Sequence, residues 1–431
     1  MTSATFPRVP LFLAFLLLSP AAVADWPQFR GPDRTGLSPE TGLIDPWPEG
    51  GPPIVWRRDI GEGFTGLVLQ DGKLFTAFAE ADKEFLGRFD AATGEEVWRV
   101  ELGERFQESF GNGPRSTPTL DGGTIYALGA RGRLVAVDVA DGAIQWSLDL
   151  FERYGIFDTQ VLVAIAPTPQ GERQLPFFGY ASSPLVVDDL LIVDTGARHG
   201  KSLVALRKAN GEEVWTALDS EVGYTSPTLV ETLGQRQILM AAGTELVGLA
   251  PADGRVLWRH PWAATLAQPL LVPPAKVFAS AANDVGAVMV QLREGPEGIQ
   301  TEELWRTRRL KNAWNSSVIV GDRIYGFDNA TLRCVDVDTG ELLWARRGLG
   351  QGTLIHADGK LIALSDRGKV FVGRATDEGF EELGSLQVLE GRSWTPMSLA
   401  DGILYLRNQS QMAALDLRAT ATPAPKPGET P

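Results

Sequence analysis

The sequence predicts an all-β protein built as a closed ring of four-stranded antiparallel sheets, an eight-bladed β-propeller. Three observations predict this fold. A pattern of alternating apolar residues, a tight turn and a tryptophan recurs along almost the whole chain. Successive tryptophans stand mostly 39–48 residues apart, close to the roughly 40–45 residues of a four-stranded propeller blade. The 431 residues include 47 Gly and 28 Pro, a composition that favours turns and short strands over long helices.

Most repeats carry a glycine four residues before the tryptophan, as in "LVAVDVADGAIQWSLDL" (134–150) and "LRCVDVDTGELLWARRG" (332–348). We expect this glycine to take the positive φ that closes a turn, and the indole to fill the wedge between neighbouring sheets. Because every unit needs the same turn, we interpret these residues as structural. The blade tryptophans are Trp56, Trp98, Trp146, Trp215, Trp258, Trp305 and Trp344.

A second pattern opens the first strand of each unit, as in "STPTL" (116–120) and "TSPTL" (225–229). Together the two patterns describe four strands joined by hairpins. The innermost position of these first strands is mostly small and polar, which we attribute to crowding at the ring axis. The units begin near residues 64, 115, 181, 224, 266, 314, 351 and 394.

The eighth unit has no fourth strand before the chain ends, whereas "PPIVWRRDI" (52–60) resembles a fourth strand that has no unit in front of it. We therefore expect this N-terminal strand to close the last blade against residues 412–417, which leaves no open sheet edge at the seam. Residues 52–418 then form one ring. An insertion at 151–180 is either a contact arm or a lid packed on the ring.

The two ends of the chain predict its location. Arg8, the apolar run "LFLAFLLL" (11–18) and "AVA" (22–24) form the pattern of a signal peptide (1–24) cleaved after Ala24. We therefore expect a periplasmic or secreted protein without a transmembrane segment. The N-terminal arm (25–51) is expected to pack on the ring as a strap, and the Pro-rich tail (419–431) to be disordered. The net charge of -14 without a long basic run argues against nucleic-acid binding, and we expect a monomer.

The repeat units and the Ser-Pro or Thr-Pro strand openings resemble the PQQ-like β-propeller repeat family over nearly all of the mature chain. The segment "DWPQFRGPDRTGLSPETGL" (25–43) is similar to the N-terminal arm of a secreted bacterial subgroup. The family includes quinoprotein dehydrogenases and the non-catalytic propeller lipoprotein of the outer-membrane β-barrel assembly machinery. The resemblance is specific for the fold and does not select one activity.

Two classes of function follow from this resemblance. A quinoprotein dehydrogenase of alcohols or sugars would hold PQQ with calcium and use an Asp base and two adjacent cysteines, but Cys334 is the single cysteine of this chain. The three histidines lack metal-ligand spacing. We therefore expect no catalytic residue, no metal and no cofactor, with the dehydrogenase as the alternative. The favoured prediction is a protein-binding or scaffold module for a cell-envelope partner, acting in cell-envelope or outer-membrane protein assembly.

Aromatic and Arg residues gather just before the first strands, and these residue types are enriched in binding hot spots. Counted from the strand-opening proline, Arg115, Tyr224 and Trp314 share one ring, and Trp394 lies one position deeper with Arg392 beside it. We predict a binding site centred on these five residues. In the alternative interpretation they only pack the arm and the insertion onto the ring.

Overall fold

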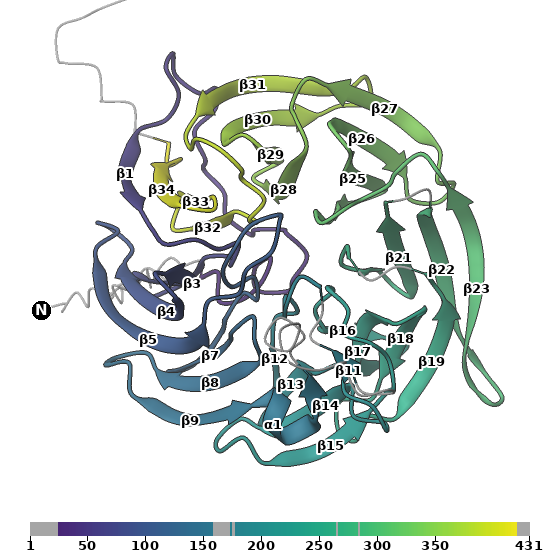
Figure 1. The fold of residues 1–431 in the computed structure, drawn as a ribbon. Coiled ribbons are helices and arrows are strands. Elements are labelled where there is room, and N and C mark those ends of the chain that lie inside the picture. Colours follow the sequence, from purple (N-terminus) through teal and green to yellow (C-terminus); the bar gives the residue numbers. More distant parts are fainter. Residues whose placement is uncertain (1–24, 158–172, 175–176, 264–265, 283–284, 420–431) are drawn as a thin grey trace, which may run out of the picture.

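The computed structural model describes residues 25–157, 173–174, 177–263, 266–282 and 285–419. Their strands form eight four-stranded antiparallel sheets around a central axis (Figure 1). The predicted eight-bladed β-propeller is therefore confirmed. The predicted signal peptide, much of the insertion and nearly all of the tail lie outside the described residues.

The first four blades each run through four consecutive strands. Blades 1 and 2 contain β2 (Val68–Gln70), β3 (Lys73–Glu80), β4 (Lys83–Asp90), β5 (Glu96–Glu104), β6 (Thr119–Asp121), β7 (Thr124–Leu128), β8 (Arg133–Asp138) and β9 (Ile144–Asp149). Blades 3 and 4 contain β12 (Leu185–Val187), β13 (Leu190–Asp194), β14 (Leu203–Arg207), β15 (Glu213–Ala217), β16 (Thr228–Thr232), β17 (Gln235–Ala242), β18 (Glu245–Leu249) and β19 (Val256–Pro261).

The last four blades follow the same order, except that the final sheet takes a strand from the N-terminus. Blades 5 and 6 contain β20 (Leu270–Val272), β21 (Lys276–Ala281), β22 (Gly286–Gly295), β23 (Gly298–Thr307), β24 (Val318–Val320), β25 (Arg323–Asp328), β26 (Thr331–Asp336) and β27 (Leu342–Arg347). Blades 7 and 8 contain β28 (Gly352–Ala357), β29 (Lys360–Ser365), β30 (Lys369–Ala375), β31 (Phe380–Gln387), β32 (Ser398–Ala400), β33 (Ile403–Arg407), β34 (Gln411–Asp416) and β1 (Ile54–Asp59).

The described residues between blades 2 and 3 form a short helix and a small parallel pair of strands. Asp149 caps the helix, because its carboxylate accepts hydrogen bonds from the backbone N–H groups of Phe151 and Glu152 at 2.8 and 3.1 Å. This crossing holds α1 (Leu150–Tyr154), β10 (Ile156–Phe157) and β11 (Arg173–Gln174).

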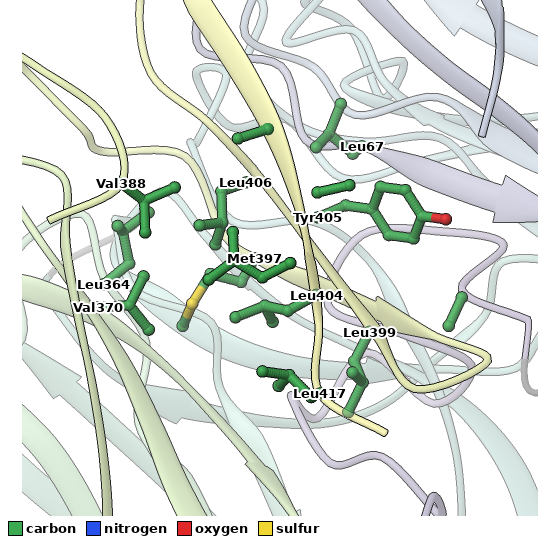
Figure 2. Packing of buried hydrophobic residues seen from close by; sticks show 14 of the residues in the cluster. Leu67, Leu364, Val370, Val388, Met397, Leu399, Leu404, Tyr405, Leu406 and Leu417 are labelled. Atoms are coloured by element: carbon green, nitrogen blue, oxygen red, sulfur yellow. The ribbon is translucent and has the colours of Figure 1, made fainter. Parts of the chain in front are cut away.

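The seam of the ring joins the two ends of the fold as predicted. Strand β1 pairs antiparallel with β34, with Trp56 opposite Ala414 and Asp59 opposite Gln411. The apolar cluster at the seam includes residues of blades 7, 8 and 1. Figure 2 shows Met397 lying between Leu364 on blade 7 and Leu404 on blade 8. The seam is thus held by a buried core as well as by backbone hydrogen bonds.

The recurring glycines and tryptophans meet between blades. Gly94 has φ +70°, and the side of its Cα where another residue would carry a Cβ lies against the indole of Trp56 on the preceding blade. The same contact joins Gly142 to Trp98, Gly211 to Trp146, Gly254 to Trp215 and Gly340 to Trp305. Five of the indoles, those of Trp56, Trp146, Trp215, Trp305 and Trp344, also donate an N–H bond to a carbonyl of the next blade at 2.9–3.0 Å. The spacing in the sequence therefore reflects a contact that repeats from blade to blade.

This contact predicts the cost of filling the glycine position. A Cβ on Gly254, at φ +71°, would lie 2.5 Å from an indole carbon of Trp215. We expect Gly254→Ala to lower the unfolding free energy by about 2–4 kcal/mol, through left-handed backbone strain and overlap with the ring. Gly359 is the matched control, because it has φ +70° and open space around a Cβ. Gly359→Ala should cost only about 1 kcal/mol, and equal losses in urea titrations would contradict the indole contact.

A chain of hydrogen bonds links the first strands around the axis. The backbone N–H of Thr117 donates to Ser183 Oγ at 3.0 Å, and that of Ser183 donates to Ser226 Oγ at 2.9 Å. Equivalent bonds at 3.0–3.1 Å join Gly66 to Thr117, Ser226 to Gln268 and Gln268 to Ser316. Crowding alone is therefore an incomplete reason for the small polar residues predicted here, because these side chains also accept a bond from the preceding blade.

The N-terminal arm crosses the centre of the ring (Figure 1). It lies on the turn face, which we define as the face where first strands turn into second strands. Trp26 pairs with Leu69 of blade 1, and Leu37 pairs with His356 of blade 7. Between these contacts the buried guanidinium of Arg30 donates to the carbonyls of Ser316 and Ser317 on blade 6. The arm therefore bonds to blades on opposite sides of the axis.

Candidate functional site: the crossing face

The face opposite the arm is where the chain passes from one blade to the next, and we call it the crossing face. In seven blades we take the residue four positions before the first residue of the first strand. The first strand of blade 7 begins earlier, so its equivalent residue, Gln351, is found by counting back from the hairpin between β28 and β29. We call these eight residues the mouth ring, because they surround the ring axis on this face. They are Phe64, Arg115, Ala181, Tyr224, Leu266, Trp314, Gln351 and Trp394.

The mouth ring corrects one detail of the sequence prediction. Trp394 stands at the same level as Arg115, Tyr224 and Trp314, not one position deeper. The difference arises because the hairpin between the first two strands sets the register. In blade 8 that hairpin places Pro396 one position earlier than Pro118 of blade 2. A count from proline therefore misplaces the eighth blade.

The aromatic residues of the mouth form one continuous cluster. The rings of Trp314 and Trp394, from blades 6 and 8, have centroids 4.6 Å apart, and Phe64 stacks on Trp394 at 5.7 Å. Phe110 contacts Trp394 at 6.4 Å and Phe178 at 5.8 Å. Phe178 in turn meets Tyr224 edge-on at 5.2 Å and Phe177 at 4.9 Å. We call these seven residues the mouth aromatics.

The two predicted arginines occupy different environments. Arg115 is partly buried, forms an ion pair with Glu108 at 2.5 Å and donates to the carbonyls of Gly111 and Gly113 at 2.7 and 2.9 Å. Its role is therefore to hold the crossing between blades 1 and 2. Arg392 is exposed, lies 4.5 Å from the centroid of Trp394 and donates to the carbonyl of Phe110.

A buried carboxylate accepts hydrogen bonds from the crossing between blades 1 and 2. Glu84 of β4 accepts hydrogen bonds from the backbone N–H groups of Phe106 and Ala130 at 3.1 and 2.9 Å. Burial raises the pKa of Glu84 to about 7, although these two bonds and the charge of Arg115 act in the opposite direction. The carboxylate thus ties the third strand of blade 1 to the turn after β7 of blade 2 and to the loop that carries Phe110.

The structure brings the five predicted residues into one network. Trp314 and Arg392 each contact Trp394. Arg115 joins them through Phe64, and Tyr224 joins them through Phe178 and then Phe110. The predicted site lacked four of the mouth aromatics, Phe64, Phe110, Phe177 and Phe178. The last two belong to the predicted insertion, and the run "PFFGY" just before the third blade was their only signal.

The turn-face end of the ring axis, as the described residues line it, does not fit a calcium-bound quinone. The arm fills the turn-face end of the axis with the guanidinium groups of Arg30 and Arg34, both buried. Among the described residues, no three His, Cys, Asp or Glu side chains are grouped to hold a metal ion. Cys334 is buried in β26, and burial raises the pKa of its thiol to about 12. In the part of the chain that the structure describes, no helix is both long and apolar enough to cross a membrane.

A family model described as outer membrane protein assembly factor BamB matches residues 48–175 and 82–346, more than half of the chain. The chain belongs to this family. A curated relative, outer membrane protein assembly factor BamB of Shewanella oneidensis, is 23% identical over 332 residues, which cover 74% of this chain and 67% of the relative. The predicted resemblance to PQQ-like propellers is confirmed.

Solved structures agree with the fold. BamB from Moraxella catarrhalis superposes with a TM-score of 0.58 at 13% identity and covers 84% of this chain and 99% of that one. Quinohemoprotein alcohol dehydrogenase from Comamonas testosteroni has a TM-score of 0.59 at 11% identity and covers 93% of this chain and 81% of the enzyme. At these identities the likeness concerns the fold alone, so it does not choose between the two functions.

Proposed function

We propose that this protein is a non-catalytic protein-binding module of the bacterial cell envelope that acts in outer-membrane protein assembly. Membership of the BamB family supports the assembly role, and the signal-peptide pattern of residues 1–24 supports a periplasmic location. The observation that carries the proposal is the cluster of mouth aromatics, a contiguous and partly exposed surface of the kind that marks interaction sites. The protein acts as a monomer that presents this face to its partner.

The dehydrogenase alternative is weaker. Quinoprotein chemistry needs a carboxylate-lined site for calcium and quinone, whereas the axis here is occupied by two guanidinium groups of the protein's own arm. We expect no saturable, quinone-dependent dye reduction with alcohols or aldoses after incubation with PQQ and calcium. Turnover that survives dialysis would reverse the proposal.

The binding role is tested by identifying and reconstituting the partner. The chain from Asp25 onward serves as bait in envelope extract, and each captured protein is then purified and titrated against the bait alone. Trp314→Ala should weaken this binary binding about 30-fold, the effect of a hot-spot residue worth about 2 kcal/mol. Val214→Ala is the control, because Val214 is exposed on the outer rim. Failure to reconstitute binding with any captured envelope protein would contradict the proposal.

A further inference from the structure

We propose that the mouth aromatics bind an acidic protein segment that carries an aromatic or aliphatic anchor side chain. The inference rests on the proposed function, because it specifies what a protein partner must present to the crossing face. It has two parts, an apolar surface and an excess of positive charge beside it.

The apolar surface is distinct from the rest of the exterior. Phe110, Phe177 and Trp314 are 47%, 65% and 43% exposed, and they are the only aromatic side chains among the exposed large hydrophobics of the described residues. All three lie on the crossing face and contact other mouth aromatics. The remaining exposed large hydrophobics are aliphatic residues on the outer strands, one or two positions before a blade tryptophan, namely Val55, Val97, Ile144, Val214, Leu304 and Leu343.

The charge beside this surface has the opposite sign to that of the whole protein. The protein carries a net charge of -14. On the crossing face, however, the crossings that lead into blades 6 to 8, and the turns between their second and third strands, contain more basic than acidic residues. The basic residues are Arg308, Arg309, Lys311, Arg367 and Arg392, and the acidic residues are Asp366 and Glu390. Arg367 and Arg392 are exposed, and neither forms an ion pair with a described carboxylate. This local excess favours a segment rich in carboxylates.

The two parts meet at Trp394. Arg392 lies 4.5 Å from the centroid of the Trp394 ring, and the ring of Trp314 lies 4.6 Å from it. A carboxylate of the partner can therefore bond Arg392 while the neighbouring side chain of the partner packs against Trp314. Aromatic anchors fit best, because edge and offset contacts between rings add to the gain from burial.

The experiment uses the full mature chain and three fluorescein-labelled decapeptides, read by fluorescence anisotropy. In the first peptide Glu alternates with Trp, in the second Lys replaces Glu, and in the third Ser replaces Trp. We expect saturable binding of the first peptide, weakened by added salt, and at least tenfold weaker binding of the other two. Trp314→Ala and Arg392→Glu should each weaken binding of the first peptide tenfold or more. Arg236→Glu, which reverses an exposed charge on the turn face, should leave it unchanged.

Three results would overturn the inference: equal affinity for the Lys peptide, undiminished binding by Trp314→Ala, or binding of chitohexaose with none of the Glu–Trp peptide, which would indicate a glycan site. Its failure is separable from that of the proposed function. If a reconstituted envelope partner binds the mouth variants as tightly as the unaltered protein, the inference falls and the function stands. If the Glu–Trp peptide binds at the mouth and no envelope partner reconstitutes, the inference stands and the assembly role falls.

Discussion

Replacing Arg34 with alanine is expected to lower the unfolding free energy by about 3–5 kcal/mol. The side chain is 1% exposed and lies where the arm meets three blades. Its guanidinium donates to the carbonyls of Ser183 and Pro227 at 3.1 and 2.8 Å, and also to the carbonyl of Pro184. Alanine would leave these buried acceptors without a donor and open a cavity beside the axis.

A second variant separates the two causes of this loss. Arg34→Met fills most of the space but offers no donor, so it should recover the cavity part and still lose about 2 kcal/mol. Arg293 is the control, because its side chain is 63% exposed on the hairpin of β22 and β23. Arg293→Ala should change stability by about 0.5 kcal/mol or less. If guanidinium chloride titrations show that Arg34→Ala loses no more unfolding free energy than Arg293→Ala, the arm does not stabilise the ring.

The ring itself could be predicted from the sequence because its main contacts are local and repeated. The glycine and the tryptophan stand four residues apart in one unit, and each unit meets the next in the same way, so a pairwise contact such as Gly94 with Trp56 leaves a periodic trace. The seam could be predicted by counting strands. The sequence has one fourth strand without a blade and one blade without a fourth strand, and pairing the two leaves no open sheet edge.

The contents of the axis and the mouth left no such trace. Arg30 and Arg34 bond mainly to backbone carbonyls, which every residue carries. The sequence therefore contains no acidic partner residue from which their burial could be predicted. Phe110, in the crossing between blades 1 and 2, meets Trp394, in the crossing between blades 7 and 8, only after the ring closes. The position of Trp394 relative to the other mouth residues depends on the register of the β32–β33 hairpin, which cannot be read from the position of Pro396. The sequence therefore predicted which types of residue gather at the mouth, but not all of the mouth aromatics.

The seam provides the second large effect, because Trp56 holds the N-terminal strand in place. Its side chain is 7% exposed, its indole N–H donates to the carbonyl of Ala91 at 2.9 Å, and Gly94 packs against its face. We expect Trp56→Ala to lower the unfolding free energy by about 3–5 kcal/mol, as for other buried aromatic truncations. Val55→Ala should cost less than about 1 kcal/mol, since Val55 is 46% exposed in the same strand.

A comparison with Trp215 isolates the seam from the blade. Trp215 has similar burial, 8% exposed, and the same kind of bond, to the carbonyl of Pro251 at 3.0 Å, but its blade is built from four consecutive strands. Both alanine variants should lose similar free energy. Only Trp56→Ala should also free β1 from β34, because no hairpin joins these two strands. Limited proteolysis measures this difference: rapid cleavage near residues 45–61 in Trp56→Ala, but not in Trp215→Ala, is the expected result. Equal protection of that segment in both variants would show that the arm, and not the seam tryptophan, keeps the ring closed.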